Sequence, residues 1–234
     1  MRIIPIAYFH SPLTSKFGIP RQSGLVQNLP GRIVFTPPFR HAEAVRGLEY
    51  FDYLWLIWEF SANNLHSSTE QDASHSAQHL TVRPPRLVGN ERVGVFASRS
   101  PFRPNSLGLS CIRIKDIEMT ADEGPVIHVL GADLMDGTPI YDVKPYVSYA
   151  DAHPEARSGF VDTTEWKPLE VHIPQPLAAK LSTEELNVLT SLLSQDPRPQ
   201  FHHDPQRQYG MHFGGHDVRF RVADGVLSVT EIIT

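Results

Sequence analysis

Cysteine is nearly absent from this chain of 234 residues, and its single cysteine, Cys111, excludes an internal disulfide framework. Cys111 stands close to Leu109 and Ile112 in a strongly apolar stretch. A free cysteine in such surroundings usually behaves as a small hydrophobic side chain. We therefore expect a buried structural thiol here rather than a nucleophile.

Long hydrophobic runs are also missing. The longest one, Tyr53 to Ile57 with Trp58 beyond it, is far shorter than the roughly 20 residues that a membrane-spanning helix needs. The first residues lack the charged segment followed by an apolar one that marks a secretory signal. These absences predict a cytoplasmic protein without a membrane segment.

An overall excess of positive charge is missing as well, because the formal net charge at pH 7 is −5. This balance argues against a protein that coats nucleic acid along its whole surface. Between Arg83 and Arg113, however, six arginines accompany a single acidic residue, Glu91. The asymmetry favours a local site for phosphate or another anion, and the alternative is that some of these arginines pair with distant carboxylates.

A convincing set of metal ligands is absent too. The polar stretch Asn63–His79 is rich in serine, histidine and glutamine, and His75 and His79 have helical i, i+4 spacing. No cysteine is near them and acidic residues are few, so a solvated loop is the better interpretation. We predict no metal.

What the chain does contain is a series of short, β-rich apolar runs separated mostly by turn residues rather than by regular helices. This pattern favours a β-barrel or sandwich over a doubly wound α/β sheet. In the first half only Phe39–Leu48 has a helical pattern. The expected strands are Arg2–His10, Ile33–Thr36, Tyr53–Phe60, Arg92–Ala97, Leu107–Met119 and Val126–Leu134.

A second unit is expected after the proline-rich connector Pro168–Pro176. Ser182 and Glu185 have the spacing of a capping box, and a leucine-lined helical face follows them. Two alternating runs around Ala223–Gly225 predict a hairpin. We therefore divide the chain into a mainly β unit over residues 1–165 and a small α+β C-terminal unit over residues 166–234.

The segment Gly94–Ser110, which we call the arginine loop, joins two strand-like runs through a cationic, hydroxyl-rich loop. Pro101 and Pro104 restrict their own φ angles and those of their neighbours, so Arg99 and Arg103 project from a stiff backbone. Preorganised groups lose less entropy on binding, and this loop suits an anionic or nucleotide-like ligand.

Four segments look like parts of one site, and their order and spelling are more specific than any of them alone. They are Pro20-Arg21-Gln22-Ser23-Gly24, Trp58–Asn63, the arginine loop and Asp133–Tyr146, and Arg83-Pro84-Pro85-Arg86 accompanies them. With these motifs the chain resembles the TsaA-like (YaeB, or TrmO) family of S-adenosyl-L-methionine-dependent tRNA methyltransferases. The likeness covers roughly residues 3–150, and segments near Asp196 and Phe220 resemble the family's bacterial C-terminal extension.

The resemblance implies a single-sheeted β-barrel that works as a homodimer and methylates N6 of threonylcarbamoyladenosine next to the anticodon. The absence of a Gly-x-Gly-x-x-Gly motif agrees with such a non-Rossmann fold. Two departures stand out: Ser61 occupies a position where the family often has histidine, and the loop Asn63–His79 is unusually long. Matched motif by motif, the implied cofactor contacts are Pro20, Arg21, Gln22, Ser61, Ala62, Arg99, Leu109, Asp133, Leu134 and Asp136.

Methyl transfer from a sulfonium is an in-line displacement, so alignment of donor and acceptor supplies much of the acceleration. The acceptor nitrogen is conjugated and weakly nucleophilic, so a group that removes or orients its proton helps. Ordinary hydrogen bonds in turns and at strand ends are an equally good explanation for the candidates. These catalytic candidates are Asp136, Asp142, Lys144 and Tyr146.

Arginine suits both a substrate carboxylate and RNA phosphate. For Arg103 and Asn105 we weigh substrate binding against a structural role in holding their loop. For Arg83 and Arg86, on a rigid extended segment, we favour contact with tRNA phosphates.

Two other functions stay open from the sequence. The same fold could methylate a different acceptor, or the chain could be a non-catalytic barrel that binds adenosine-like metabolites or RNA.

Overall fold

The computed structural model describes residues 3–62, 80–84, 87, 91–164, 166–199, 202 and 204–234. The loop Asn63–His79 and Arg86 lie outside these residues. Within the described part of the chain, no group of three histidine, cysteine or acidic side chains could hold a metal ion. None of the described helices is long and apolar enough to cross a membrane.

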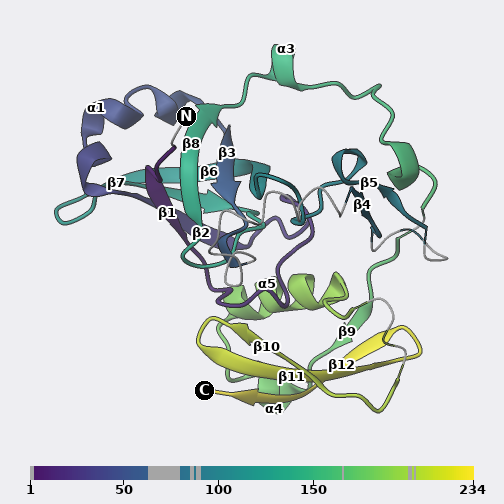
Figure 1. The fold of residues 1–234 in the computed structure, drawn as a ribbon. Coiled ribbons are helices and arrows are strands. Elements are labelled where there is room, and N and C mark those ends of the chain that lie inside the picture. The colour runs from purple at the N-terminus through teal and green to yellow at the C-terminus, as the bar shows by residue number, and fades with distance from the viewer. Residues whose placement is uncertain are drawn as a thin grey trace, which may run out of the picture.

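Residues of the first two thirds of the chain form a closed antiparallel β-barrel, seen at the upper left of Figure 1. The expectation of a single-sheeted barrel is therefore confirmed. The strands follow one another around the barrel in the order β1 (Ala7–His10), β2 (Pro30–Phe35), β7 (Gly124–Leu130), β6 (Leu107–Thr120), β3 (Tyr53–Glu59) and β8 (Pro139–Pro145).

Strand β3 shows how the sequence fills the barrel. Leu54, Leu56 and Trp58 alternate with partly exposed residues and are buried in the interior, as a half-buried strand requires. Gly108 lies opposite Trp58 on β6, and a Cβ atom there would come within 2.3 Å of the indole. The missing side chain thus lets the indole lie flat against the β6 backbone.

Two expected elements differ from the structure. The helical pattern over Phe39–Leu48 yields only one turn, α1 (Ala42–Val45), flanked by 3-10 turns at Pro37–Phe39 and Leu48–Tyr50. The chain leaves the helical region at Arg46, and Gly47 adopts a φ of +89°, so the helix cannot continue.

The expected strand Arg92–Ala97 is also mostly wrong. Only Val93–Gly94 (β5) is extended, and it pairs with β4 (Thr81–Val82) in a separate two-stranded sheet. Residues Val95–Ala97 form a 3-10 turn instead, because the Ser98 hydroxyl donates a hydrogen bond back to the Val95 carbonyl at 2.9 Å. Such local side-chain bonds compete with strand pairing.

The C-terminal unit is a four-stranded sheet covered by α5 (Thr183–Ser194). Ser182 and Glu185 form the expected capping box, and the predicted hairpin turns at Asp224 and Gly225, both with positive φ. The sheet order is β10 (Tyr209–Phe213), β11 (His216–Ala223), β12 (Val226–Ile233) and β9 (Glu170–His172). The unit also contains the short helix α4 (Gln175–Ala178). Before the unit, the chain forms α3 (Ser148–Asp151) and a 3-10 turn at Gly159–Val161.

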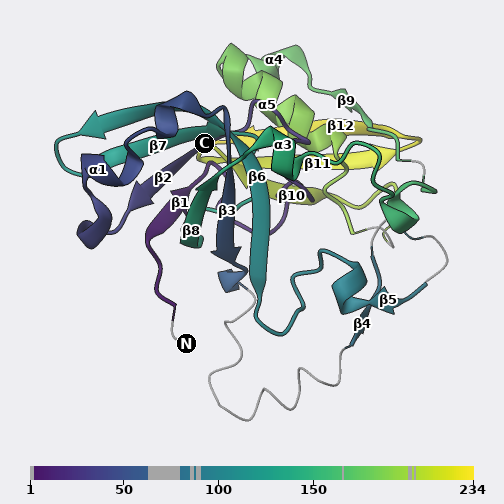
Figure 2. The same ribbon diagram turned by 90° about the horizontal axis from the view of Figure 1, so that it is seen from above.

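The connection between β1 and β2 links the two units. In Figure 1 it leaves the barrel and runs down beside α5, and Figure 2 shows the C-terminal sheet packed behind the barrel in the view from above. Leu13, Val26 and Leu29 of this connection are buried in the same apolar cluster as Leu189 of α5 and Phe220 of β11. The C-terminal core is therefore built partly from N-terminal residues.

Candidate functional site

Three connections meet at one end of the barrel, and they carry most of the residues that the sequence singled out. Strand pairing fixes this end, because His10 pairs with Arg32, Pro30 with Leu130, and Glu59 with Leu107. The connections at this end are residues 11–29, residues 131–138 and the segment between β3 and β6, of which the structure describes residues 60–62, 80–84, 87 and 91–106.

Two glycines join the first and third of these connections. The Gly24 amide donates to the Gly131 carbonyl at 2.8 Å, and the Gly131 amide donates to the Leu29 carbonyl at the same distance. Both glycines have φ near +80°, a conformation in which other residues are strained. This pairing fixes the Pro20–Gly24 segment against the residues that follow β7.

Arg99 and Gln22 are also brought together, although 77 positions separate them in the sequence. The Arg99 guanidinium donates a hydrogen bond to the side-chain oxygen of Gln22. The amide nitrogen of Gln22 in turn donates to the Arg21 carbonyl at 2.6 Å, and Pro20 beside it is buried. Two segments proposed for the cofactor thus touch directly.

Asp133 lies near Arg99 and the Ser23 backbone, and Gln22, Arg99 and Asp133 together form one cluster. The Oδ1 atom of Asp133 accepts a hydrogen bond from the Ser110 hydroxyl at 2.6 Å, and the Ser110 oxygen accepts one from the Trp58 indole at 3.0 Å. Burial raises the pKa of the Asp133 carboxyl, while hydrogen bonds from Ser110 and the Ser23 backbone and the nearby Arg99 charge oppose the rise. The carboxylate is thus a buried acceptor facing a cation.

The arginine loop is held largely by its own side chains. The Arg103 guanidinium donates to the carbonyls of Ser98 and Ser100, at 3.1 and 3.4 Å. These bonds agree with the loop-holding alternative for Arg103, while Asn105 stays exposed at the tip. Phe102 exposes 69% of its surface on this loop, so an apolar side chain also faces solvent there.

Ser61, Ala62 and Leu109 lie around the same end of the barrel. Ser61 and Ala62 are half-buried and follow Phe60, whose amide donates to the Ser106 carbonyl at 2.8 Å. Leu109 is 58% exposed on the outer face of β6, opposite Ile57. Leu134, by contrast, is buried in the barrel core, so its side chain supports the connection from inside.

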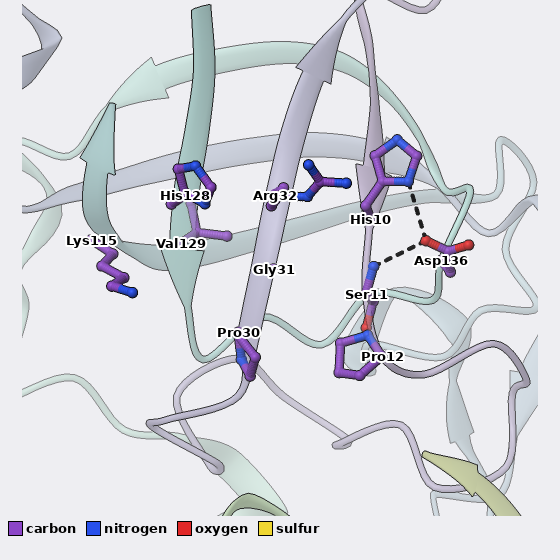
Figure 3. Close-up of a pocket in the computed structure, with 10 residues that line it drawn as sticks. All are labelled: His10, Ser11, Pro12, Pro30, Gly31, Arg32, Lys115, His128, Val129 and Asp136. Carbon is purple, nitrogen blue, oxygen red and sulfur yellow. Dashed lines mark hydrogen bonds and ion pairs between the residues drawn. The ribbon is translucent and has the colours of Figure 1, made fainter. Parts of the chain in front are cut away.

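Asp136 has a different set of partners. Its Oδ1 atom accepts from the Ser11 amide at 3.0 Å and lies 3.4 Å from Nδ1 of His10. Figure 3 shows these groups at one side of an open cavity of about 420 Å³, with Lys115 and His128 on the other side and Arg32 between them. Asp136 therefore links the connection before β8 to the end of β1.

Of the other three catalytic candidates, Asp142 and Lys144 lie on β8 and Tyr146 directly follows it, away from the Arg99–Gln22 contact. Lys144 and Asp142 form an ion pair of 3.0 Å, and the Tyr146 ring packs against Tyr53 and Trp55. At about 3.3 Å per residue, Tyr146 lies roughly 20 Å along the strand from Pro139. Within a single chain, these three side chains therefore lie outside the cluster of Gln22, Arg99 and Asp133.

The comparisons with known proteins now settle the family. The model of the tRNA-methyltransferase O N-terminal domain matches residues 8–152, and that of the C-terminal domain matches residues 166–234. This chain belongs to the tRNA-methyltransferase O family. Its resemblance to that family, inferred above from the motifs, is thereby confirmed.

Individual members of the tRNA-methyltransferase O family are similar over nearly the whole chain. The tRNA (adenine(37)-N6)-methyltransferase of Escherichia coli is 36% identical over 233 residues, covering 96% of this chain and 94% of that protein. A Pseudomonas aeruginosa protein provisionally named as an S-adenosylmethionine-dependent methyltransferase is 36% identical over 93% of this chain and 91% of its own. A crystal structure of TrmO from Pseudomonas aeruginosa superposes with a TM-score of 0.75 at 29% identity, covering 100% of this chain and 99% of that one.

The residues of the cluster fit the cofactor of the tRNA-methyltransferase O family. S-adenosylmethionine carries a carboxylate, an ammonium group, ribose hydroxyls and an adenine. The Arg99 guanidinium is a donor for a carboxylate, and the Asp133 carboxylate is an acceptor for ammonium or hydroxyl groups. The cluster therefore offers complementary partners to the charged methionine end and to the ribose hydroxyls of the molecule.

Sequence reasoning missed Ser110 and the Tyr141–Glu59 pair. The Tyr141 hydroxyl donates to Oε2 of Glu59, and burial, then this bond and the Glu59 charge, raises the pKa of Tyr141 to about 12. Ser110 could have been found from the alternation of β6. Gly108 and Ile112 on either side of it are buried, so Ser110 is a polar residue at an inward position of the strand.

Proposed function

We propose that this protein transfers a methyl group from S-adenosylmethionine to N6 of threonylcarbamoyladenosine next to the anticodon of tRNA. Family membership makes the chain an S-adenosylmethionine-dependent tRNA adenine-N6 methyltransferase. The observation that carries the assignment to particular residues is the cluster of Gln22, Arg99 and Asp133 from three separate connections. We assign catalysis to residues 1–165 and treat residues 166–234 as a second structural unit.

The proposed cofactor site uses this cluster and its surroundings. Arg99 binds the carboxylate of the cofactor, with Gln22 fixing the guanidinium, and Asp133 accepts hydrogen bonds from the cofactor. When bound, S-adenosylmethionine supplies an electrophilic methyl group on a good leaving group. The supporting contacts are assigned to Pro20, Arg21, Ser61, Ala62, Leu109, Asp136 and the backbone of Leu134, whose side chain lies in the barrel core.

The reaction itself needs alignment and the removal of one proton. The N6 atom attacks the methyl carbon, the carbon–sulfur bond breaks, and N6 gives up its proton. Asp136 is our first candidate to accept or orient that proton, because it lies at the same end of the barrel as Asp133 and borders an open cavity. Arg83, Arg86 and Asn105 are proposed to contact the tRNA, and Arg103 is proposed to hold the loop that presents Asn105.

We further propose a homodimer, formed across the outer face of β3 and β8. Tyr53, Trp55 and Ile57 point outward on β3, and Leu109 continues this apolar surface on β6. A partner seated there would approach Lys144 and Tyr146, which are remote from the cluster of their own chain. Asp142, Lys144 and Tyr146 would then serve the partner's site.

Mixing two impaired variants tests this arrangement. Arg99→Ala and Lys144→Ala remove residues that different chains contribute to the same site. A mixed dimer therefore keeps one site with both residues intact and should regain activity that neither variant has alone. Sedimentation at micromolar concentration should show a dimer. A monomer, or a mixture as inactive as its components, would refute the shared site.

The function is tested by mass spectrometry of nucleosides from threonylcarbamoyl-modified tRNA incubated with the protein and S-adenosylmethionine. The modified nucleoside should gain the mass of one methylene unit, and unmodified tRNA should not. Arg99→Ala should lose the product, whereas the control Arg92→Ala should keep it, because Arg92 binds Thr81 in the separate small sheet. Tight cofactor binding without product would point to another acceptor. Because the proposed substrate is tRNA, we also propose a cytoplasmic location for the protein.

A further inference from the structure

The β1–β2 connection has two different sides. Its polar residues Gln22 and Ser23 reach Arg99 and Asp133 of the barrel. Its apolar residues do the opposite: they enter the core of the C-terminal unit. Leu13, Val26 and Leu29 are fully buried there, with Phe17 and Ile19 packed against the same cluster.

Phe17 makes the most specific of these contacts. Its ring stacks on Tyr209 of β10 and on Phe220 of β11, with centroids 6.4 and 6.3 Å away. Next to it, Gly18 lies so close to Met211 that a Cβ atom would come 2.6 Å from the Met211 methyl carbon. The backbone is also tied, because the Gly214 amide donates to the Pro12 carbonyl at 3.1 Å.

These anchors lie only a few positions before the Pro20–Gly24 segment. Pro20 restricts the backbone between the two groups, so the position of Phe17 is transmitted to Gln22. On the other flank, Leu29 is buried in the C-terminal core and its carbonyl accepts from Gly131. The segment is thus held on both flanks by residues that the C-terminal unit packs.

We propose that the C-terminal unit positions the Pro20–Gly24 segment for the cofactor, with Phe17 as the main positioning residue. This inference rests on the cofactor role proposed above for that segment. A segment fixed before the cofactor arrives loses less conformational entropy on binding. The C-terminal unit is therefore a structural part of the cofactor site.

Variants at Phe17 test the proposal, with Val171→Ala as the matched control. Val171 packs in the same core but lies on β9, at the opposite edge of the sheet from β10. Phe17→Ala should raise the KM for S-adenosylmethionine about tenfold, the factor that ~1.4 kcal/mol produces. The value of kcat at saturating cofactor should hardly change. Hydrogen exchange at the amides of Ser23 and Gly24 should become faster without any cofactor.

The outcomes separate positioning from general destabilisation. Val171→Ala should lower the melting temperature and leave the KM for the cofactor unchanged. Phe17→Leu replaces Phe17→Ala if the alanine variant does not fold, and it should show a smaller rise in KM. An unchanged KM and unchanged exchange in the folded Phe17 variant would overturn the proposal, as would an equal rise in Val171→Ala.

Gln22→Ala tests the proposed function separately. An unchanged cofactor affinity in Gln22→Ala would refute the role of the segment in cofactor binding through Arg99, and the positioning role with it. An unchanged affinity in the Phe17 variants alone would refute only the positioning role of the C-terminal unit.

Discussion

Ser110 donates a hydrogen bond of 2.6 Å to Asp133, and this bond ties the connection after β7 to the interior of β6. The Trp58 indole bonds the same serine oxygen at 3.0 Å, so a chain of three side chains runs from the barrel core to the candidate site. The site is therefore continuous with the core, and changes in the core are expected to reach it.

Asp133→Asn should weaken cofactor binding and change the pH dependence of stability. The pKa of Asp133 is raised, chiefly by burial, so the folded state binds a proton more readily than the unfolded state. The stability from this group is complete below the unfolded pKa and is lost as pH rises through the folded one. Melting curves across the acid range should therefore show that the melting temperature of the variant rises relative to that of the wild type as pH rises. A constant difference in melting temperature would contradict this.

Tyr141→Phe should destabilise the fold by about 1 kcal/mol at neutral pH, because the hydroxyl bond to Glu59 is lost. The pKa of Tyr141 is raised to about 12, so the stability linked to its proton is present below pH 10 and lost toward pH 12. Urea unfolding at pH 8 measures the first effect. An ultraviolet titration of tyrosinate should show one late-titrating tyrosine that is absent from the variant.

Gly108→Ala should cost about 1–3 kcal/mol, the usual penalty for overpacking a core. The new methyl group would lie within 2.3 Å of the Trp58 ring, which must move away from Ser110. Gly94→Ala is the matched control, because nothing lies within 4 Å of its added Cβ and its φ is −58°. Urea unfolding should show a large loss for the first variant and almost none for the second.

Arg83→Ala should weaken tRNA binding and reduce its salt dependence. Arg83 is exposed beside β4, where a cation can reach phosphate. Each lost phosphate contact lowers the slope of log K against log salt by roughly 0.7–0.9. Filter binding of tRNA at several salt concentrations measures this slope. Equal slopes for variant and wild type would exclude Arg83 from the phosphate contacts.

The short strands, the capped helix and the final hairpin could be predicted because each depends on local pattern. That pattern left a barrel and a sandwich open, and the resemblance to the family pointed to the barrel. Alternation in β3, the Ser182–Glu185 spacing and the Asp224–Gly225 turn act over a few residues. The failed predictions also have local causes: Gly47 stops the helix early, and the Ser98 hydroxyl bends the chain after β5.

The family, the β-rich architecture and the types of side chain in the candidate site follow from the amino-acid pattern alone, because motifs and periodicity are properties of neighbouring residues. Which of these residues meet became visible in the three-dimensional fold. It joined Gln22 to Arg99 and Asp133 to Ser110, left Lys144 and Tyr146 on another face, and buried Leu13 and Leu29 in the C-terminal core. Such contacts depend on strand register and on the packing of distant segments, and no local pattern encodes them.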